Sequence, residues 1–336
     1  MPSQTGGRSR RRYLSSLVSA VGALSLAGCA ADGDSATESG TSTGSASAAT
    51  PTATASAGGT EDPALGDVVE DDRFALVAYS VGRSADFESL EAYDGEGHIV
   101  VDVAVQNTQE SEYASVSYYR GLTLRDGESR EYGPTVVGPT PRLQAGELVP
   151  GEVARGFVTF ESVPVDATGL TLDIMPTTET AGADTATISL ESDGTGRTLT
   201  HDFAVPVHEL GETTEYEDTR FTATEVRTST GGDTASPGPG NEFVVVDFTV
   251  ENTGSDELFL NNAIQTSVKD NEGRTYDLSQ TALRTIDDGA GSITVDPDSE
   301  QQGAVGFEVE AGVEPLYLVI DLDDVWVGGR RFYQLR

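Results

Sequence analysis

Two stretches decide the fold, Val101-Asp-Val-Ala-Val-Gln-Asn-Thr108 and Val246-Asp-Phe-Thr-Val-Glu-Asn-Thr253. In each, apolar residues alternate with polar or small ones, and a period of two predicts a β-strand with one face toward a core. The aspartates, Asp102 and Asp247, are predicted to face the other way. Each stretch ends in Asn-Thr, which suits a turn because asparagine can hydrogen-bond its own backbone.

Three further blocks repeat in the same order and at nearly the same spacing. Four blocks in one order predict two copies of a single β-domain. Gly156 and Gly303 fall inside apolar strands, where a glycine usually marks a bulge or a close approach of two backbones. The aligned blocks are Leu124–Tyr132 with Val268–Tyr276, Pro150–Phe160 with Pro297–Phe307, and Leu170–Ile174 with Leu316–Ile320.

The repeat sets the domain organisation. Copy one is expected at 67–206 and copy two at 207–336, joined near the short polar stretch 210–214. Chains of this length can bury a core of their own. No segment has a sustained helical period, and the nearest, 279–286, predicts one or two turns.

The repeated pattern resembles the DUF4352 (telokin-like) domains of prokaryotic lipoproteins. It combines V-V-D-x-x-V-x-N-T with an x-D-x-x-G-R-x-Y hairpin and a closing L-x-L-x-I strand, and it is cleaner in copy two, at Val244–Gly254. The resemblance implies an all-β fold, two tandem immunoglobulin-like β-sandwich domains that follow a disordered tether. No catalytic residue and no cofactor come with it.

The N-terminal 28 residues resemble an export signal. Arg10 and Arg11 lie in a twin-arginine pattern, and Leu26-Ala27-Gly28-Cys29 resembles the lipobox at which a lipoprotein signal is cut. The apolar stretch between them is too short to span a hydrocarbon core of ~30 Å. We therefore expect export in the folded state and lipid attachment at Cys29, the only cysteine in the chain.

Residues 29–66 are expected to form a lipidated, flexible tether rich in Ser, Thr, Ala and Gly. Within it, Gly40-Thr-Ser-Thr-Gly44 matches the G-x-S-x-G motif of serine hydrolases. That motif needs a preceding strand and a following helix, which low-complexity sequence does not supply. The sequence therefore predicts no catalytic site and no enzyme activity.

Charge is the second large feature. The chain has 56 acidic and 20 basic residues, and Lys269 is the only lysine. The acidic residues are spread through apolar segments, as in haloarchaeal surface proteins, and molar salt would screen their mutual repulsion. Nucleic acid is a poor partner for such a chain.

Candidate sites are few. The best metal candidates are Asp321, Asp323 and Asp324, which follow a strand, although so acidic a chain produces clusters by composition alone. No two histidines are spaced as a metal pair. Two aromatic groups could stack on sugar or dock a partner, or could equally belong to the core; they are Tyr113, Tyr118 and Tyr119, and Trp326, Phe332 and Tyr333.

The leading hypothesis is a non-enzymatic lipoprotein of the extracellular membrane face. It is anchored through Cys29 and presents two immunoglobulin-like domains to a surface protein or a polysaccharide. The alternative is an accessory module that binds a solute or a divalent metal and serves a transporter.

Overall fold

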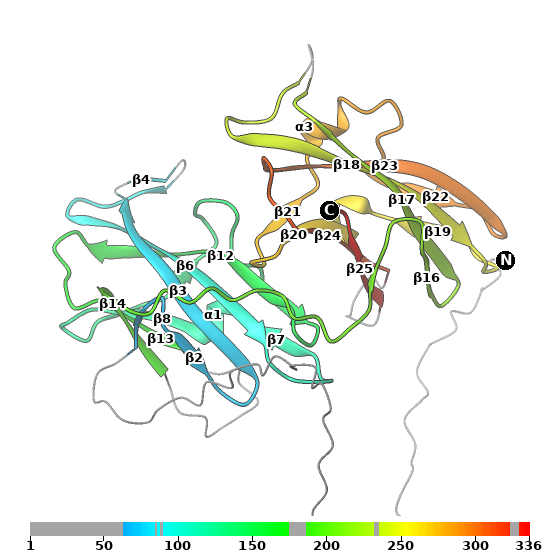
Figure 1. Ribbon diagram of the computed structural model, residues 1–336. Coiled ribbons are helices and arrows are strands. Elements are labelled where there is room, and N and C mark those ends of the chain that lie inside the picture. Colours follow the sequence, from blue (N-terminus) through cyan, green and yellow to red (C-terminus); the bar gives the residue numbers. More distant parts are fainter. Residues whose placement is uncertain (1–62, 85, 88–89, 175–185, 232–234, 323–328) are drawn as a thin grey trace, which may run out of the picture. The chain divides into compact units, whose positions relative to one another are not determined.

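Copy one folds as two facing β-sheets in the computed structural model, which describes residues 63–84, 86–87, 90–174, 186–231, 235–322 and 329–336 (Figure 1). Its elements are β1 (Ala64–Leu65), β2 (Val68–Glu70), β3 (Phe74–Ser84), β4 (Asp86–Phe87), β5 (Leu90–Glu91), β6 (Glu96–Asn107), β7 (Ala114–Val116), α1 (Tyr118–Gly121), β8 (Leu122–Arg125), β9 (Glu131–Tyr132), β10 (Pro134–Thr135), β11 (Gly146–Leu148), β12 (Val153–Pro164), β13 (Thr171–Ile174) and β14 (Ala186–Asp193). One sheet has the order β1-β14-β13-β8-β9 and the other β10-β12-β6-β3-β2.

Copy two has the same plan. Its elements are β15 (Val207–His208), β16 (Thr213–Tyr216), β17 (Thr219–Ser229), β18 (Asn241–Asn252), β19 (Leu258–Leu260), α2 (Asn262–Gln265), β20 (Thr266–Asp270), β21 (Thr275–Asp277), α3 (Gln280–Leu283), β22 (Ile293–Val295), β23 (Ser299–Glu310), β24 (Leu316–Asp321) and β25 (Arg330–Gln334). Its sheets run β15-β25-β24-β20-β21 and β16-β17-β18-β23. The first repeats the strand order of copy one, and the second corresponds to β2-β3-β6-β12, without a counterpart of the edge strand β10. The predicted all-β fold of two repeated β-sandwiches is confirmed.

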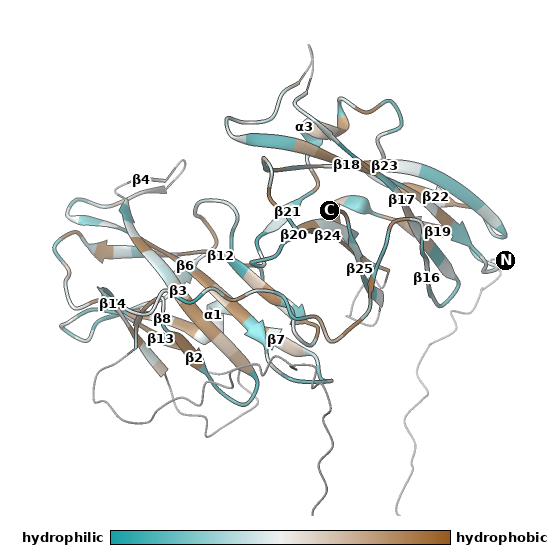
Figure 2. Cartoon of the chain, viewed as in Figure 1, coloured by the Kyte–Doolittle hydropathy of each residue, from teal (hydrophilic) through white to brown (hydrophobic). Residues whose placement is uncertain are grey.

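The two decisive stretches are the central strands β6 and β18. As predicted, Val101, Val103 and Val105 enter the core of copy one, and Val246, Phe248 and Val250 enter the core of copy two. Figure 2 shows the hydrophobic residues concentrated along these strands and their neighbours. The adjoining strands β3 and β17 each carry a register shift at corresponding places, next to Ala78 and Ala223.

The Asn-Thr ends are held by a buried amide rather than by a simple surface turn. Asn107 donates hydrogen bonds to the carbonyls of Glu112 and Leu148, at 2.8 and 3.0 Å, and its Oδ1 accepts from the backbone N–H of residue 109. Asn252 repeats all three bonds in copy two. Each asparagine thus ties the end of the central strand to the following loop and to a distant strand.

The repeated glycines differ in what surrounds them. A Cβ on Gly156 would lie 2.2 Å from the backbone nitrogen of Leu143, so two backbones approach closely here, as predicted. On Gly303 a Cβ would meet side chains instead, with Phe248 Cζ the nearest atom at 3.0 Å. Copy one therefore has the stricter requirement for glycine.

Among the described residues the helices are single turns. The helix predicted near 279–286 is α3, and the Ser279 side chain caps it by accepting a hydrogen bond from the N–H of Ala282. Sequence analysis missed α1 and α2, because four residues are too few to show a helical period. No described helix has the length and apolar character needed to cross a membrane.

Candidate functional site

The junction of the two copies is the most elaborate polar region that the structure describes. Residues 59–336 form one compact unit, and residues 194–206 connect β14 to β15. The stretch 210–214, expected near the join, leads from β15 into β16.

The connecting segment is hydrogen-bonded to both copies. The His201 N–H donates to the carbonyl of Asn271 in copy two, at 3.0 Å. The Asp202 N–H donates to the carbonyl of Gly151 in copy one, at 2.9 Å. Gly151 has φ of +80°, and a Cβ there would lie 1.7 Å from the Asp202 carbonyl oxygen, so only glycine fits.

An apolar cluster fills part of the junction. Val149 of copy one and Val319 and Phe332 of copy two are buried in one cluster, against which Phe203, Val205 and Val207 pack. The rings of Phe203 and Phe332 lie 4.6 Å apart, and the His201 ring stacks on Phe203 at 4.4 Å. The junction is therefore packed like the core of a domain.

A buried ion pair lies beside this cluster. Glu152 of copy one and Lys269 of copy two form a salt bridge, with side chains only 0% and 8% exposed. The Lys269 ammonium also donates to the Val153 carbonyl at 3.1 Å, and Arg330 approaches Glu152 to 3.3 Å. Burial raises the pKa of Glu152, but the charges of Lys269 and Arg330 outweigh it and hold that pKa below its usual value.

A second charged group crosses the junction at Arg155. Its guanidinium makes two hydrogen bonds to Asp102, at 3.1 and 2.7 Å, contacts Glu272 of copy two, and lies 3.9 Å from the centre of the Tyr79 ring. Asp102 thus faces away from the core of copy one, as predicted, yet it is buried because copy two and the connecting segment cover that face. Asp247 keeps a surface pair with Arg227 at 2.9 Å.

His201 is held neutral in the junction. Its Nδ1 accepts a hydrogen bond from the Val153 N–H at 2.9 Å, so the remaining ring proton belongs on Nε2. Burial, together with the nearby charge of Lys269, lowers the pKa of His201 to about 3, although Glu152 opposes that shift. The ring therefore adds no charge to the junction at neutral pH.

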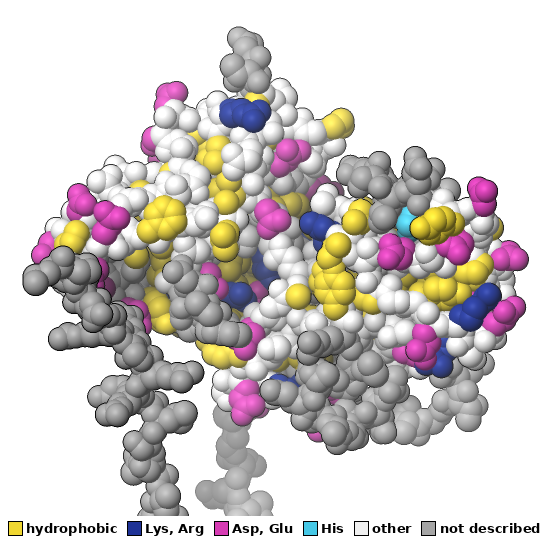
Figure 3. Space-filling model, turned by 180° about the vertical axis from the view of Figure 1, so that it is seen from behind, with side chains coloured by type: hydrophobic (Ala, Val, Ile, Leu, Met, Phe, Trp, Pro, Cys, Tyr) yellow, Lys and Arg dark blue, Asp and Glu magenta, His cyan; other side chains and the backbone are white. Residues whose placement is uncertain are grey.

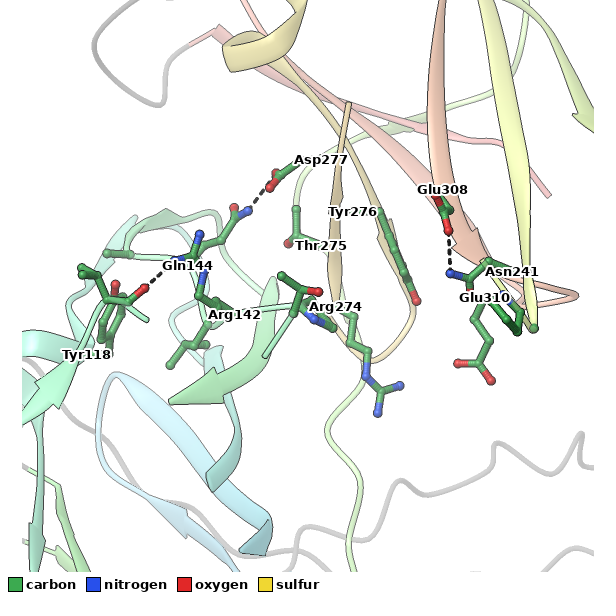
Figure 4. A pocket seen from close by; sticks show the side chains of 17 residues that line it. Tyr118, Arg142, Gln144, Asn241, Arg274, Thr275, Tyr276, Asp277, Glu308 and Glu310 are labelled. Atoms are coloured by element: carbon green, nitrogen blue, oxygen red, sulfur yellow. Dashed lines mark hydrogen bonds between the residues drawn. The ribbon is translucent and has the colours of Figure 1, made fainter. Parts of the chain in front are cut away.

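A cleft of about 1120 Å³ opens on the junction, with walls from both copies (Figure 4). Copy one contributes Tyr118, Val136 and the segment 140–145. Copy two contributes the segments 239–241 and 274–277, with Glu308 and Glu310. Gln144 reaches from one wall to the other and donates a hydrogen bond to Asp277 at 3.0 Å.

The polar groups of the cleft are held by neighbouring residues. Glu308 accepts hydrogen bonds from the Gly238 N–H at 2.7 Å and from the Asn241 amide at 3.0 Å. Arg142 donates to the Val136 carbonyl, and Arg274 lies 3.6 Å from Glu272. Burial, followed by hydrogen bonding to Tyr119, raises the pKa of Tyr118 to about 12, so its hydroxyl stays protonated and can donate.

The residues singled out from sequence lie elsewhere or outside the described part. Asp321 ends β24, with its carboxylate 3.7 Å from Arg330, whereas Asp323 and Asp324 fall outside the described residues. In the parts of the chain that the structure describes, no three His, Cys, Asp or Glu side chains gather to hold a metal ion. Arg10, Arg11 and Cys29 also lie outside the described residues.

The histidines and aromatic residues separate by burial. His98 is buried in β6, and His208 lies 3.3 Å from Glu212. Phe332 and Tyr333 are core residues, and Trp326 falls outside the described part of the chain. Of the first aromatic group, Tyr113 and Tyr119 are 44% and 43% exposed, and Tyr118 lines the cleft.

Sequence analysis missed the junction and the cleft. The sequence offered one signal, because Lys269 is the only lysine in the chain. Its partner Glu152 is 117 residues away in sequence, and no local pattern links the two.

On the surface, Figure 3 shows acidic side chains scattered over the face in view.

Comparison with known families identifies the class of domain. The model of DUF4352, "Domain of unknown function (DUF4352)", matches residues 63–185 and again 208–331. The chain therefore belongs to the DUF4352 family and carries the domain twice in tandem. None of the curated proteins with which the chain was compared matches it.

Several solved structures are similar to part of the chain. The yjhA protein of Bacillus subtilis is 17% identical, with a TM-score of 0.30, over 39% of this chain and 100% of its own. A Bacillus subtilis protein described as "putative lipoprotein (ycdA)" is 19% identical, with a TM-score of 0.31, over 37% of this chain and 39% of its own. An uncharacterised β-sandwich protein of Clostridium difficile is 14% identical, with a TM-score of 0.27, over 39% of this chain and 95% of its own.

Proposed function

We propose that this protein is a lipid-anchored, non-enzymatic binding protein of the extracellular membrane face, and that its two DUF4352 domains act as one binding unit. The observation that carries the proposal is the cleft, whose walls come from both copies and which opens on a buried, charge-paired junction. A site built in this way depends on the tandem arrangement rather than on either domain alone.

The charges at the junction favour binding over catalysis. Strongly perturbed ionisable groups often mark active sites, but structural ion pairs perturb pKa values as well. Glu152 and Lys269 are paired with each other under the surface, and Arg155 is paired with Asp102. The shifted pKa values of these groups are therefore explained by ion pairs that hold the two copies together.

The anchor supports a role at the membrane. Lipid on Cys29, joined to the domains by a Ser/Thr/Ala/Gly-rich segment, would confine the cleft to the cell surface and raise its effective concentration toward neighbouring molecules. The solute-binding alternative agrees with the cleft. Its divalent-metal form has less support, because Asp321 already lies 3.7 Å from Arg330.

Membrane fractionation tests the anchor. The Cys29→Ser chain should move from the membrane fraction to the medium, because the substituted residue has no thiol to lipidate. The Ser45→Ala chain, altered in the same N-terminal segment, is the matched control and should stay with the membrane. Unchanged membrane retention of the Cys29→Ser chain would overturn the proposed anchoring.

A further inference from the structure

We propose that the cleft binds a neutral, hydroxyl-rich saccharide chain. This inference rests on the proposed function, since it names the ligand class of the same binding unit. It starts from the chemistry of the cleft walls, which combine charged groups of both signs, side-chain amides and tyrosines.

The charge balance of the walls argues against a strongly charged ligand. Two guanidinium groups, on Arg142 and Arg274, stand against three carboxylates, on Asp277, Glu308 and Glu310. A polyanion would meet the carboxylates, and a polycation would meet the guanidiniums. A neutral ligand incurs neither repulsion.

The hydrogen-bonding groups suit hydroxyls. A hydroxyl donates one hydrogen bond and accepts others, so it is best served by walls that offer both donors and acceptors. Here the arginines donate, the carboxylates accept, and Gln144 and Asn241 do both. Arginine, amide and carboxylate groups are also planar, and several are already fixed by the bonds described above, which reduces the entropy lost on binding.

Aromatic surface leads into the cleft. Tyr118 lines it, and the Tyr119 ring lies 4.4 Å from the Tyr118 ring and is 43% exposed. Val136, another lining residue, is 54% exposed. A sugar ring has apolar C–H faces and a hydroxylated rim, and tyrosine is matched to it because an apolar ring carries a polar tip.

An extended peptide fits these walls less well. A peptide that adds to a sheet needs a free strand edge. Beside the cleft, the edge strand β23 is bridged at Phe307 by Leu278. The short edge strand β21 lies between that bridge and the bridge of Arg274 to Arg155, so it offers only three residues to a peptide. The volume, about 1120 Å³, lies just above the range of about 300–1,000 Å³ that is typical of small-molecule pockets, which leaves room for more than one sugar unit.

The test uses the full-length Cys29→Ser chain, purified from whichever fraction holds it. The probe is the neutral polysaccharide fraction of the producing cell's own envelope, with the acidic polysaccharide fraction and a Ser/Thr-rich peptide as comparisons. Binding is measured by affinity electrophoresis and calorimetry in molar KCl. Tyr118→Ala and Gln144→Ala should each weaken binding of the neutral fraction about tenfold, through the lost ring contact or the lost amide.

Tyr93→Ala is the matched control, because Tyr93 is 78% exposed and does not line the cleft. It should bind as the parent chain does. Failure to bind the neutral fraction, binding of the acidic fraction or the peptide alone, or equal weakening in Tyr93→Ala would overturn the inference. Membrane fractionation of the same chain reports separately on the anchor, so the two proposals can fail independently.

Discussion

Lys269→Met should be among the most destabilising single substitutions in the chain. It removes one partner of an ion pair whose side chains are 8% and 0% exposed and leaves the Glu152 carboxylate buried. Breaking such a pair typically costs about 3–5 kcal/mol. We expect the lower end, about 3 kcal/mol, because Arg330 at 3.3 Å and the Val149 N–H at 3.0 Å still stabilise the carboxylate.

Thermal unfolding in molar KCl measures the effect. For a unit of this size, a loss of about 3 kcal/mol should lower the midpoint by about 6–12 °C. The double variant Lys269→Met, Glu152→Met should recover at least half of that loss, because two apolar side chains leave no unpaired carboxylate. Arg220→Met is the matched surface control, since Arg220 pairs with Glu215 at 3.2 Å with both side chains exposed; it should cost less than about 1 kcal/mol.

Two results would refute this reasoning. One is a Lys269→Met chain as stable as the Arg220→Met chain, which would mean that the ion pair is open to water in solution. The other concerns a double variant whose loss equals the sum of the losses of Lys269→Met and Glu152→Met, each measured alone; that result would mean that Glu152 and Lys269 do not interact.

Two further predictions concern His201 and the repeated glycines. In the folded chain the pKa of His201 is about 3, so the ring stays neutral down to about that pH, whereas in the unfolded chain its pKa has the ordinary value of 6.5. The stability that this ring contributes is therefore nearly complete at pH 7 and is lost as the pH falls, by about 2 kcal/mol between pH 7 and pH 5. His201→Phe should reduce this loss in melts at the two pH values, and an unchanged loss would contradict the assignment. Gly156→Ala should cost about 3 kcal/mol, since its Cβ would meet backbone, and Gly303→Ala about 1 kcal/mol, since Phe248 can shift. Chemical denaturation gives both values, and the reverse order would show that the close approach at Gly156 is not real.

The repeated strands were predictable because their signal is local. Alternation along Val101–Thr108 and Val246–Thr253, followed by matching hairpins and closing strands, fixes which residues face each core. The sequence predicted that Asn107 and Asn252 lie at the ends of the central strands. It did not predict their hydrogen bonds to β11 and β22, because each asparagine is more than forty residues away in sequence from the strand that it contacts.

The junction could not be predicted, because it depends on which outer face of copy one meets copy two. Asp102 and Asp247 occupy equivalent positions in similar sequence environments, yet only Asp102 is buried. The neighbouring position is Arg155 in copy one and Gln302 in copy two, a difference that is visible in the sequence. The sequence does not show why this difference matters; the structure does, because Arg155 contacts Glu272 of copy two.

The position of Lys269 also makes the chain unusual toward lysine-directed chemistry. The folded protein has a single lysine side chain, and it lies inside the junction rather than on the surface. A protease that cuts after lysine has one possible site in the whole chain, and that site is covered while the copies stay together. Acylation of the Lys269 amine meets the same restriction, so modification at that residue, measured separately from modification of an N-terminal amine, reports how often the two copies separate.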